Sequence, residues 1–196
     1  MSKKILPIVE GDGDVAAVPV LIRRILQANS RYDVQVLSPH KRGELPKVKA
    51  NFERFFKTAA LEGVPVLCVL DFDCSQCIDA ISDEQDLQHR AKKIHPSLPF
   101  AACLIVKEFE SLFLWDEAST RQALPNIIKN TIFPLNPEDI RPAKEWLSKA
   151  QPSGLAYKPT VHQAKLAAAV NLDVLRARSP SYQRLELAVL KLTEPI

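Results

Sequence analysis

Strand-sized apolar runs that alternate with helical segments constrain the fold of this chain more than any other feature of its sequence. The runs are residues 4–10 (KILPIVE), 32–38 (YDVQVLS), 64–73 (VPVLCVLDFD) and 100–106 (FAACLIV). Between them, helices are predicted over residues 14–29, 45–63 and 82–96. Apolar strands that alternate with helices are typical of a parallel sheet covered on both faces. The sequence therefore predicts an α/β fold with about four parallel strands flanked by helices.

The character of the chain changes after residue 117. The prolines that divide the next segment into short pieces are Pro125, Pro134, Pro137, Pro142, Pro152 and Pro159. Residues 160–178 and 181–192 then carry apolar side chains at helical spacing, which predicts two amphipathic helices. We therefore expect a core in residues 1–117 and a helical C-terminal extension, residues 118–196, that packs as a cap on the same domain.

Composition limits the classes of protein to which the chain can belong. Its 196 residues are 46% hydrophobic and carry a net charge of +3, which permits a polyanionic partner without requiring one. The longest apolar runs fall well short of the roughly 20 residues that span a bilayer, and the N-terminus lacks the apolar region of a signal peptide. We expect a cytoplasmic protein without a membrane segment.

Acidic side chains follow the ends of the predicted strands. They are Glu10, Asp12 and Asp14 after the first run, Asp71 and Asp73 after the third, and Glu108 and Glu110 after the fourth. The carboxyl ends of parallel strands lie at one edge of a sheet, so acids far apart in sequence can converge in one crevice. Converging carboxylates repel one another unless a cation neutralises them, and oxygen ligands without histidine suit Mg²⁺ or Mn²⁺. We expect a divalent metal site at this edge.

The spacing inside two of these motifs favours shared coordination. In an extended chain, Asp71 and Asp73 point to the same side, while the residue between them turns toward the core. In EGDGD the glycines can adopt a positive φ, and a sharp turn there would aim Glu10 and Asp14 into one space. Asp12 is explained more simply as an acid that stabilises the N-terminus of the following helix.

Taken in order, these motifs resemble the Toprim-domain family, and the chain is most similar to small Toprim-like proteins of unknown function related to the OLD (overcoming lysogenisation defect) nucleases. The matching stretches are VEGDGDVAAVPVLIRRIL, VLDFD and KEFESLFLWD, within the first 117 residues. The resemblance implies a Rossmann-like Toprim core. It also implies metal ligands at Glu10, Asp14, Asp71, Asp73 and Glu110, with Glu108 as the competing choice for the last position.

The activity that the resemblance implies is two-metal hydrolysis of phosphodiester bonds in nucleic acid, with DNA as the expected substrate. Glu10 and Asp71 would be catalytic, and a lysine near the phosphate would stabilise developing charge. Lys158 is the expected lysine because it stands in a Tyr-Lys pair similar to one in the family's tail, and Lys107 is the other candidate. Related proteins act in phage defence beside an ATPase, so an ATPase partner is expected. Self-association stays open, and a noncatalytic subunit of an ATPase complex is the alternative function.

A basic stretch follows the second predicted strand. It contains Lys41, Arg42, Lys47 and Lys49, with His40 at its start. Such side chains suit contacts with backbone phosphates and a salt-dependent affinity for nucleic acid. A solvated loop and helix face is the alternative explanation.

A dinucleotide site is a rival interpretation of the first turn. Gly11-x-Gly13-x-x-Ala16 follows a predicted strand and precedes a predicted helix, as in dinucleotide-binding folds. Against this, the acids of the turn would face a pyrophosphate, and the second strand ends in Ser38 instead of an acid that could hold a ribose.

The cysteines allow one further site. Cys74 and Cys77, followed by His89 and His95, come close to zinc-finger ligand spacing, although the gap between the pairs is one residue short. The two other cysteines, at positions 68 and 103, lie inside apolar runs and are expected in the core.

Overall fold

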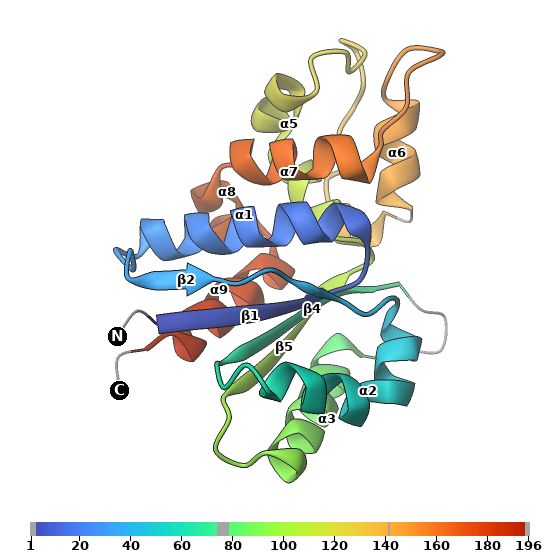
Figure 1. Cartoon of the computed structure of the whole chain (residues 1–196). Coiled ribbons are helices and arrows are strands. Elements are labelled where there is room, and N and C mark those ends of the chain that lie inside the picture. The colour runs from blue at the N-terminus through green and yellow to red at the C-terminus, as the bar shows by residue number, and fades with distance from the viewer. Residues whose placement is uncertain (1–2, 74–78, 141, 195–196) are drawn as a thin grey trace.

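The computed structural model describes residues 3–73, 79–140 and 142–194 and has a parallel sheet at its centre (Figure 1). The strands are β1 (Lys3–Val9), β2 (Val34–Val36), β3 (His40–Lys41), β4 (Val66–Phe72) and β5 (Phe100–Val106). Their order is β2-β1-β4-β5, with β3 also paired to β1, and every pair is parallel. The predicted α/β fold with a parallel sheet is confirmed.

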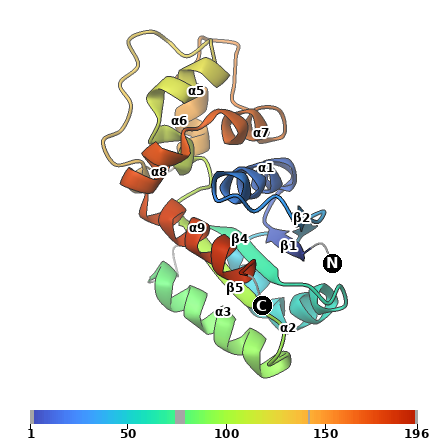
Figure 2. The same ribbon diagram turned by 90° about the vertical axis from the view of Figure 1, so that its left-hand side faces the viewer.

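Helices cover both faces of this sheet. They are α1 (Asp12–Ala28), α2 (Leu45–Ala60), α3 (Ala80–Ile94), α4 (Ser111–Leu114), α5 (Glu117–Ala123), α6 (Ala143–Lys149), α7 (Pro159–Ala169), α8 (Leu172–Arg178) and α9 (Pro180–Leu192), with a 3₁₀ turn η1 (Pro137–Asp139). Helices α1 and α9 lie on one face, while α2 and α3 lie on the other (Figure 2). Within the described ranges, no helix is both long and apolar enough to cross a membrane.

Alternation along the strands assigns each side chain to one of two cores. Leu67 and Val69 in β4 pack on the α1 face, whereas Cys68 and Leu70 pack on the α2 face. Continuing this alternation, Asp71 belongs to the α1 face, and the next residue, Phe72, packs against the α2 core. Cys68 and Cys103 are fully buried free thiols, as expected of core cysteines.

The C-terminal segment contributes to the same core as the helix that follows β1. Leu166, Leu175 and Tyr182 belong to the apolar cluster that contains Leu21 and Ile25 of α1. Helix α9 packs directly on β5, where Ser181 Oγ accepts a hydrogen bond from the Val106 N–H at 3.1 Å. The residues after 117 are therefore part of the covering of the sheet.

The single helix predicted over residues 160–178 is wrong, because the chain breaks between α7 and α8. Val170 is extended (φ −53°, ψ 137°), and the Asn171 side chain accepts from the Asp173 N–H at 2.9 Å to start α8. The Asn171 N–H in turn donates to Asp116 Oδ2 at 2.8 Å. Asp116 also caps α5 through the Ser119 N–H, so a buried carboxylate anchors two helix starts.

The free edge of β5 is covered by side chains from both faces. Glu84 Oε1 accepts from the Leu104 N–H at 2.7 Å, and Arg184 Nη2 donates to the Leu104 carbonyl at 2.8 Å. Glu84 and Arg184 are also ion-paired with each other at 3.1 Å. These contacts occupy backbone groups that would otherwise be available to pair with a strand of another molecule.

Helix α7 lies along the side of α1 that faces away from the sheet (Figures 1 and 2). Arg24 Nη1 of α1 donates to the Ala167 carbonyl at 2.8 Å. At the other end of α1, Gly13 is buried against Pro159 and Gln163 of α7. The absence of a side chain at position 13 permits this close approach.

Replacing Gly13 with alanine is expected to lower the free energy of unfolding by about 1–3 kcal/mol through overpacking. The new methyl carbon would lie 2.1 Å from Gln163 Oε1 and 2.7 Å from Pro159 Cβ. Urea denaturation followed by circular dichroism measures the loss. Gly11→Ala is the matched control in the same turn, because its methyl would meet Asp14 Oδ2 at an ordinary 3.5 Å. Equal losses in the two variants would contradict this explanation.

Candidate functional site

Acidic side chains from distant parts of the chain gather at the carboxyl edge of the sheet. We call Glu10, Asp14, Asp71, Glu108 and Glu110 the acidic cluster. Lys144 of α6 projects into it: its Nζ lies 2.9 Å from Asp71 Oδ2, 3.5 Å from Glu108 Oε1 and 3.6 Å from Glu110 Oε2. Glu10 interacts electrostatically with Asp71, Asp14 and the same lysine. The predicted convergence of acids at one edge is therefore present in the structure.

Backbone donors hold Asp71 and Glu108 in place. Asp71 Oδ1 accepts from the Phe109 N–H at 2.8 Å, which ties the end of β4 to the turn after β5. Glu108 Oε2 accepts from the Lys144 N–H at 2.9 Å, in the first turn of α6. Glu108 thus binds both the backbone and the ammonium of one residue, and it fixes α6 against the sheet.

Asp14 and Glu110 are held by side chains of the C-terminal segment. Tyr157 donates its hydroxyl hydrogen bond to Glu110 Oε1 at 3.1 Å, and Gln163 Nε2 donates to Asp14 Oδ1 at 2.8 Å. Asp14 Oδ2 accepts from the Gly11 N–H at 2.9 Å. Glu110 is fully buried, and its Oε2 has no hydrogen-bond partner among the described residues. The Lys144 ammonium lies 3.6 Å from that oxygen.

Burial is the main cause of the raised pKa values in the cluster. It raises the pKa of Glu10 to about 8, with the neighbouring Asp71 adding to the shift. It raises the pKa of Asp71 to about 7 and that of Glu110 to about 8, although Lys144 opposes both shifts. For Lys144 itself, burial lowers the pKa, but Asp71, Glu110 and Glu108 outweigh burial and raise it. One ammonium therefore neutralises the cluster only in part.

The donor set fits a divalent cation by its chemistry. The available atoms are carboxylate oxygens, which Mg²⁺ and Mn²⁺ prefer, and Glu110 Oε2 is a buried acceptor without a hydrogen bond. In the part of the chain that the structure describes, no group of three or more Asp, Glu, His or Cys side chains is arranged so that it could hold a metal ion. Lys144 supplies the positive charge in this arrangement.

Comparison with known proteins identifies the family. A family model described as a domain of unknown function (DUF4276) matches residues 9–190. The chain belongs to this family. The DUF4276 match includes the whole acidic cluster together with Lys144, Tyr157 and Gln163. No curated protein sequence matches the chain significantly.

Solved structures similar to this DUF4276 protein include C-terminal regions of OLD proteins. The region from Xanthomonas campestris pv. campestris is 15% identical, with a TM-score of 0.48 over 95% of this chain and 94% of that one. The region from Burkholderia pseudomallei is 12% identical, with a TM-score of 0.47 over 98% of this chain and 97% of that one.

The glycines of the first turn do not act as predicted. Gly11 has φ −125° and ψ 177°, and Gly13 lies inside α1, so neither adopts the expected positive φ. Gly11 instead donates its N–H to Asp14, while Gly13 allows α7 to approach. The expected helix-stabilising acid, Asp12, is the exposed first residue of α1, and its carboxylate binds Lys41 Nζ at 2.6 Å.

The lysine within the cluster is Lys144, which the sequence motifs do not indicate. Lys158 is exposed at the start of α7, its N–H donates to His162 Nδ1, and no contact joins its ammonium to the cluster in the described ranges. Lys107 is half-buried in the turn after β5, with a positive φ of 68°. A lysine in the first turn of a helix is electrostatically disfavoured unless an acid faces it, and this is the one signal that Lys144 carries.

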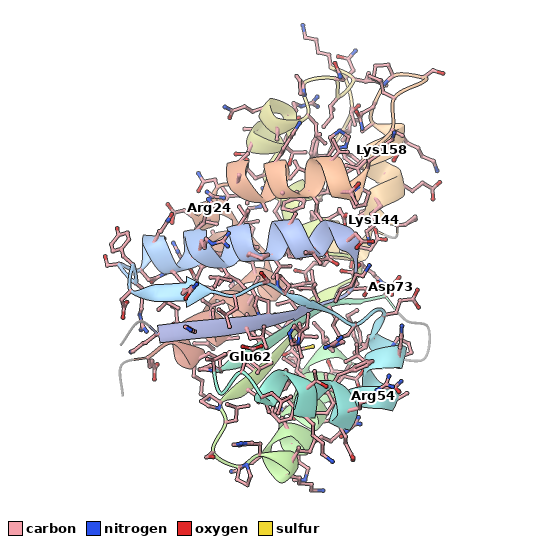
Figure 3. All side chains as sticks on the ribbon, in the orientation of Figure 1. Arg24, Arg54, Glu62, Asp73, Lys144 and Lys158 are labelled. Carbon is pink, nitrogen blue, oxygen red and sulfur yellow. The ribbon has the colours of Figure 1, made fainter. Side chains whose placement is uncertain are left out.

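The remaining predicted ligands are Asp73 and the four residues of the possible zinc site. Asp73 is half-buried one residue beyond β4, at the same end of the sheet as Lys144 (Figure 3). For the zinc site, Cys74 and Cys77 lie outside the described residues, while His89 and His95 are exposed in α3 and at its end.

The predicted basic residues divide into two groups. Lys49 is ion-paired with Asp83 at 2.5 Å, on the side of α2 that faces α3. Lys41, Arg42 and Lys47 instead line a hollow beside Glu10.

The free energy of unfolding is expected to fall as the pH rises from about 4 to about 8 in the presence of EDTA. The folded state raises the pKa of Glu10 and Glu110 from 4.5 to about 8 and that of Asp71 from 3.8 to about 7, so it binds protons more tightly than the unfolded state. This stabilisation is complete below the unfolded values and is lost as the pH passes the folded ones.

Urea denaturation across this pH range measures the slope. Glu110→Gln removes one of the titrating groups and is expected to give a shallower slope than wild type. Stability that increases over the same interval would show that the cluster is already fully ionised in the folded state.

Proposed function

We propose that this chain is a Mg²⁺- or Mn²⁺-dependent nuclease that hydrolyses phosphodiester bonds in nucleic acid, with the acidic cluster as its centre. The observation that carries this proposal is the gathering of buried carboxylates at the carboxyl edge of a parallel sheet around a single lysine. The motifs that resemble the Toprim family contribute the same acids. DNA is the proposed substrate on the strength of that resemblance.

The residues of the cluster other than Glu108 each have a proposed part in this reaction. Glu10, Asp14, Asp71 and Glu110 would hold the divalent ion, which supplies Lewis acidity that activates water and stabilises charge on the phosphate. Asp73 remains a candidate ligand. Tyr157 and Gln163 orient Glu110 and Asp14 through their hydrogen bonds. Lys144, rather than Lys158, would place a positive charge beside the phosphate.

A noncatalytic role is the second candidate function, and the position of Lys144 in the acidic cluster favours it. Because Lys144 already pairs with Asp71, the cluster holds together without any bound ion. In this alternative, the fold serves as a subunit of an assembly, and the resemblance makes an ATPase the proposed partner. Dinucleotide binding is not proposed, because α7 packs against Gly13, where the fingerprint needs room for a pyrophosphate.

Plasmid nicking in Mg²⁺ or Mn²⁺ tests the catalytic proposal. Asp71→Asn and Glu110→Gln are each expected to lower the nicking rate about 100-fold or more, because each removes a charged group from the catalytic centre. Asp86→Asn is the matched control: this carboxylate is half-exposed on α3 and pairs with Arg90 at 3.6 Å. Cleavage that persists equally in all variants would trace the activity to a contaminant. Well-folded wild type that never cleaves would favour the noncatalytic role.

Replacing Lys144 with methionine tests whether the acidic cluster binds a metal ion or is neutralised only by its own lysine. In EDTA the substitution is expected to cost about 1–3 kcal/mol of unfolding free energy, because buried carboxylates lose their counterion while the lysine itself is partly exposed. If the cluster is a metal site, millimolar Mn²⁺ restores the stability of K144M and stabilises it more than wild type.

Thermal denaturation with and without Mn²⁺ measures this difference. Lys149→Met is the control on the same helix, since Lys149 is exposed and pairs with Glu145. It is expected to respond to Mn²⁺ as wild type does. A Mn²⁺ response that is equal in K144M and K149M would contradict the idea that the ammonium and the ion occupy overlapping positions.

A further inference from the structure

A hollow with positively charged walls lies directly beside the acidic cluster. Its volume is about 390 Å³, and its lining includes Lys41, Arg42, Lys47, Arg54 and Phe55, together with Glu10 of the acidic cluster. We call it the basic hollow. Arg54 lies on α2, at the end of the sheet where Asp73 and Lys144 also lie (Figure 3). The motifs of the sequence did not indicate Arg54.

Backbone hydrogen bonds fix the basic hollow next to Glu10. Beyond the β1–β3 pairing, the Arg42 N–H donates to the Val9 carbonyl at 2.9 Å, and the Gly43 N–H donates to the Glu10 carbonyl at 3.1 Å. Gly43 has φ +85°, a conformation that turns the chain from β3 into α2. The basic residues of β3 and α2 are thereby held at a constant position relative to the cluster.

Two guanidinium groups share the ring of Phe55. The Cζ of Arg42 lies 5.3 Å from the ring centroid and that of Arg54 lies 5.1 Å from it, while Phe55 itself is 8% exposed. Arg42 Nε is buried, with no hydrogen-bond partner in the described part of the chain. Stacking on an aromatic ring orients both planar groups, and Arg42 is also held by His40, whose Nδ1 lies 3.3 Å from Arg42 Nη2. Guanidinium groups fixed in this way suit hydrogen bonds to an anion that enters the hollow.

The charges of the basic hollow are only partly neutralised by the protein. Lys41 pairs with the exposed Asp12, but within the described ranges no salt bridge joins Arg42, Lys47 or Arg54 to a carboxylate. Water and salt weaken the repulsion between these exposed or half-buried cations, and an anion bound among them would remove more of it. An oxyanion with several acceptor oxygens, such as a phosphate, can accept hydrogen bonds from the guanidinium groups of Arg42 and Arg54.

We infer that the basic hollow binds a backbone phosphodiester of a nucleic acid strand whose neighbouring phosphate lies at the acidic cluster. This inference rests on the proposed function, because the cluster supplies the reason for a strand to be present. Glu10 forms part of both sites, so a bound strand passes from one to the other across this residue. Arg42, Lys47 and Arg54 are the binding residues, and Lys49 is excluded by its pairing with Asp83.

Fluorescence anisotropy with a labelled single-stranded oligodeoxynucleotide in EDTA tests the inference without cleavage. Arg54→Gln and Arg42→Gln are each expected to weaken binding about tenfold, as for the loss of a charged hydrogen bond. Each is also expected to reduce the slope of log affinity against log salt by about 0.7 per lost contact. Lys47→Gln, an exposed substitution that leaves the Phe55 stacking intact, is expected to lower affinity in the same direction.

The matched control is Lys57→Gln, which removes the same charge from an exposed position on α2 outside the basic hollow. Equal weakening by this control and by the hollow variants would overturn the inference, since net charge alone would then explain binding. Unchanged affinity in correctly folded hollow variants would also overturn it. Inorganic phosphate is added at the same concentration as the phosphate groups of the oligonucleotide. If it displaces the oligonucleotide, the hollow is a site for free phosphate and the assignment to nucleic acid is overturned.

Plasmid nicking by wild type, measured in parallel, separates this inference from the proposed function. If wild type cleaves and the hollow variants bind normally, the nuclease proposal survives and the inference fails. If the hollow variants lose binding and wild type does not cleave, the inference holds for a nucleic-acid-binding protein that is not a nuclease.

Discussion

Carboxylates cannot gather at a buried edge without positive charge and hydrogen-bond donors around them, and this constraint explains the position of the C-terminal segment. Lys144 supplies the charge, while Tyr157 and Gln163 donate to Glu110 and Asp14. All three donors come after residue 117, in helices or loops that also complete the apolar core. The segment that covers the sheet is therefore the segment that completes the site.

The balance between this one lysine and its acids is the chemical basis of both functional proposals. Lys144 is close enough to hold the cluster together, yet burial still raises the pKa of Glu10, Asp71 and Glu110. A second positive charge would favour the ionised form of each carboxylate. A catalytic centre would gain that charge from a divalent ion, whereas a structural cluster would retain its protons.

Glu10 belongs to two groups of residues with opposite charge. It is part of the acidic cluster, and it also lines the basic hollow with the arginines stacked on Phe55. Pairing of β3 with β1 sets this arrangement, because it brings Arg42 and Gly43 to the backbone of Val9 and Glu10. Positive groups placed next to a carboxylate centre suit a nucleic acid strand. The cations can bind one phosphate of the strand while the neighbouring phosphate lies at the acidic cluster.

The parallel sheet and the meeting of its acids could be predicted from the order of residues, because apolar runs define the strands and parallel strands share one carboxyl edge. The cation that meets those acids could be identified only from the packed fold. Lys144 sits in the first turn of a short helix among prolines, and this position is the only local feature that sets it apart from other lysines. Arg54 likewise lies on an ordinary amphipathic helix, and Gly13 proved to serve helix packing instead of a turn. Contacts between segments far apart in the chain depend on how helices pack across the sheet. The spacing of apolar residues predicts the helices, but it does not predict which of their side chains meet.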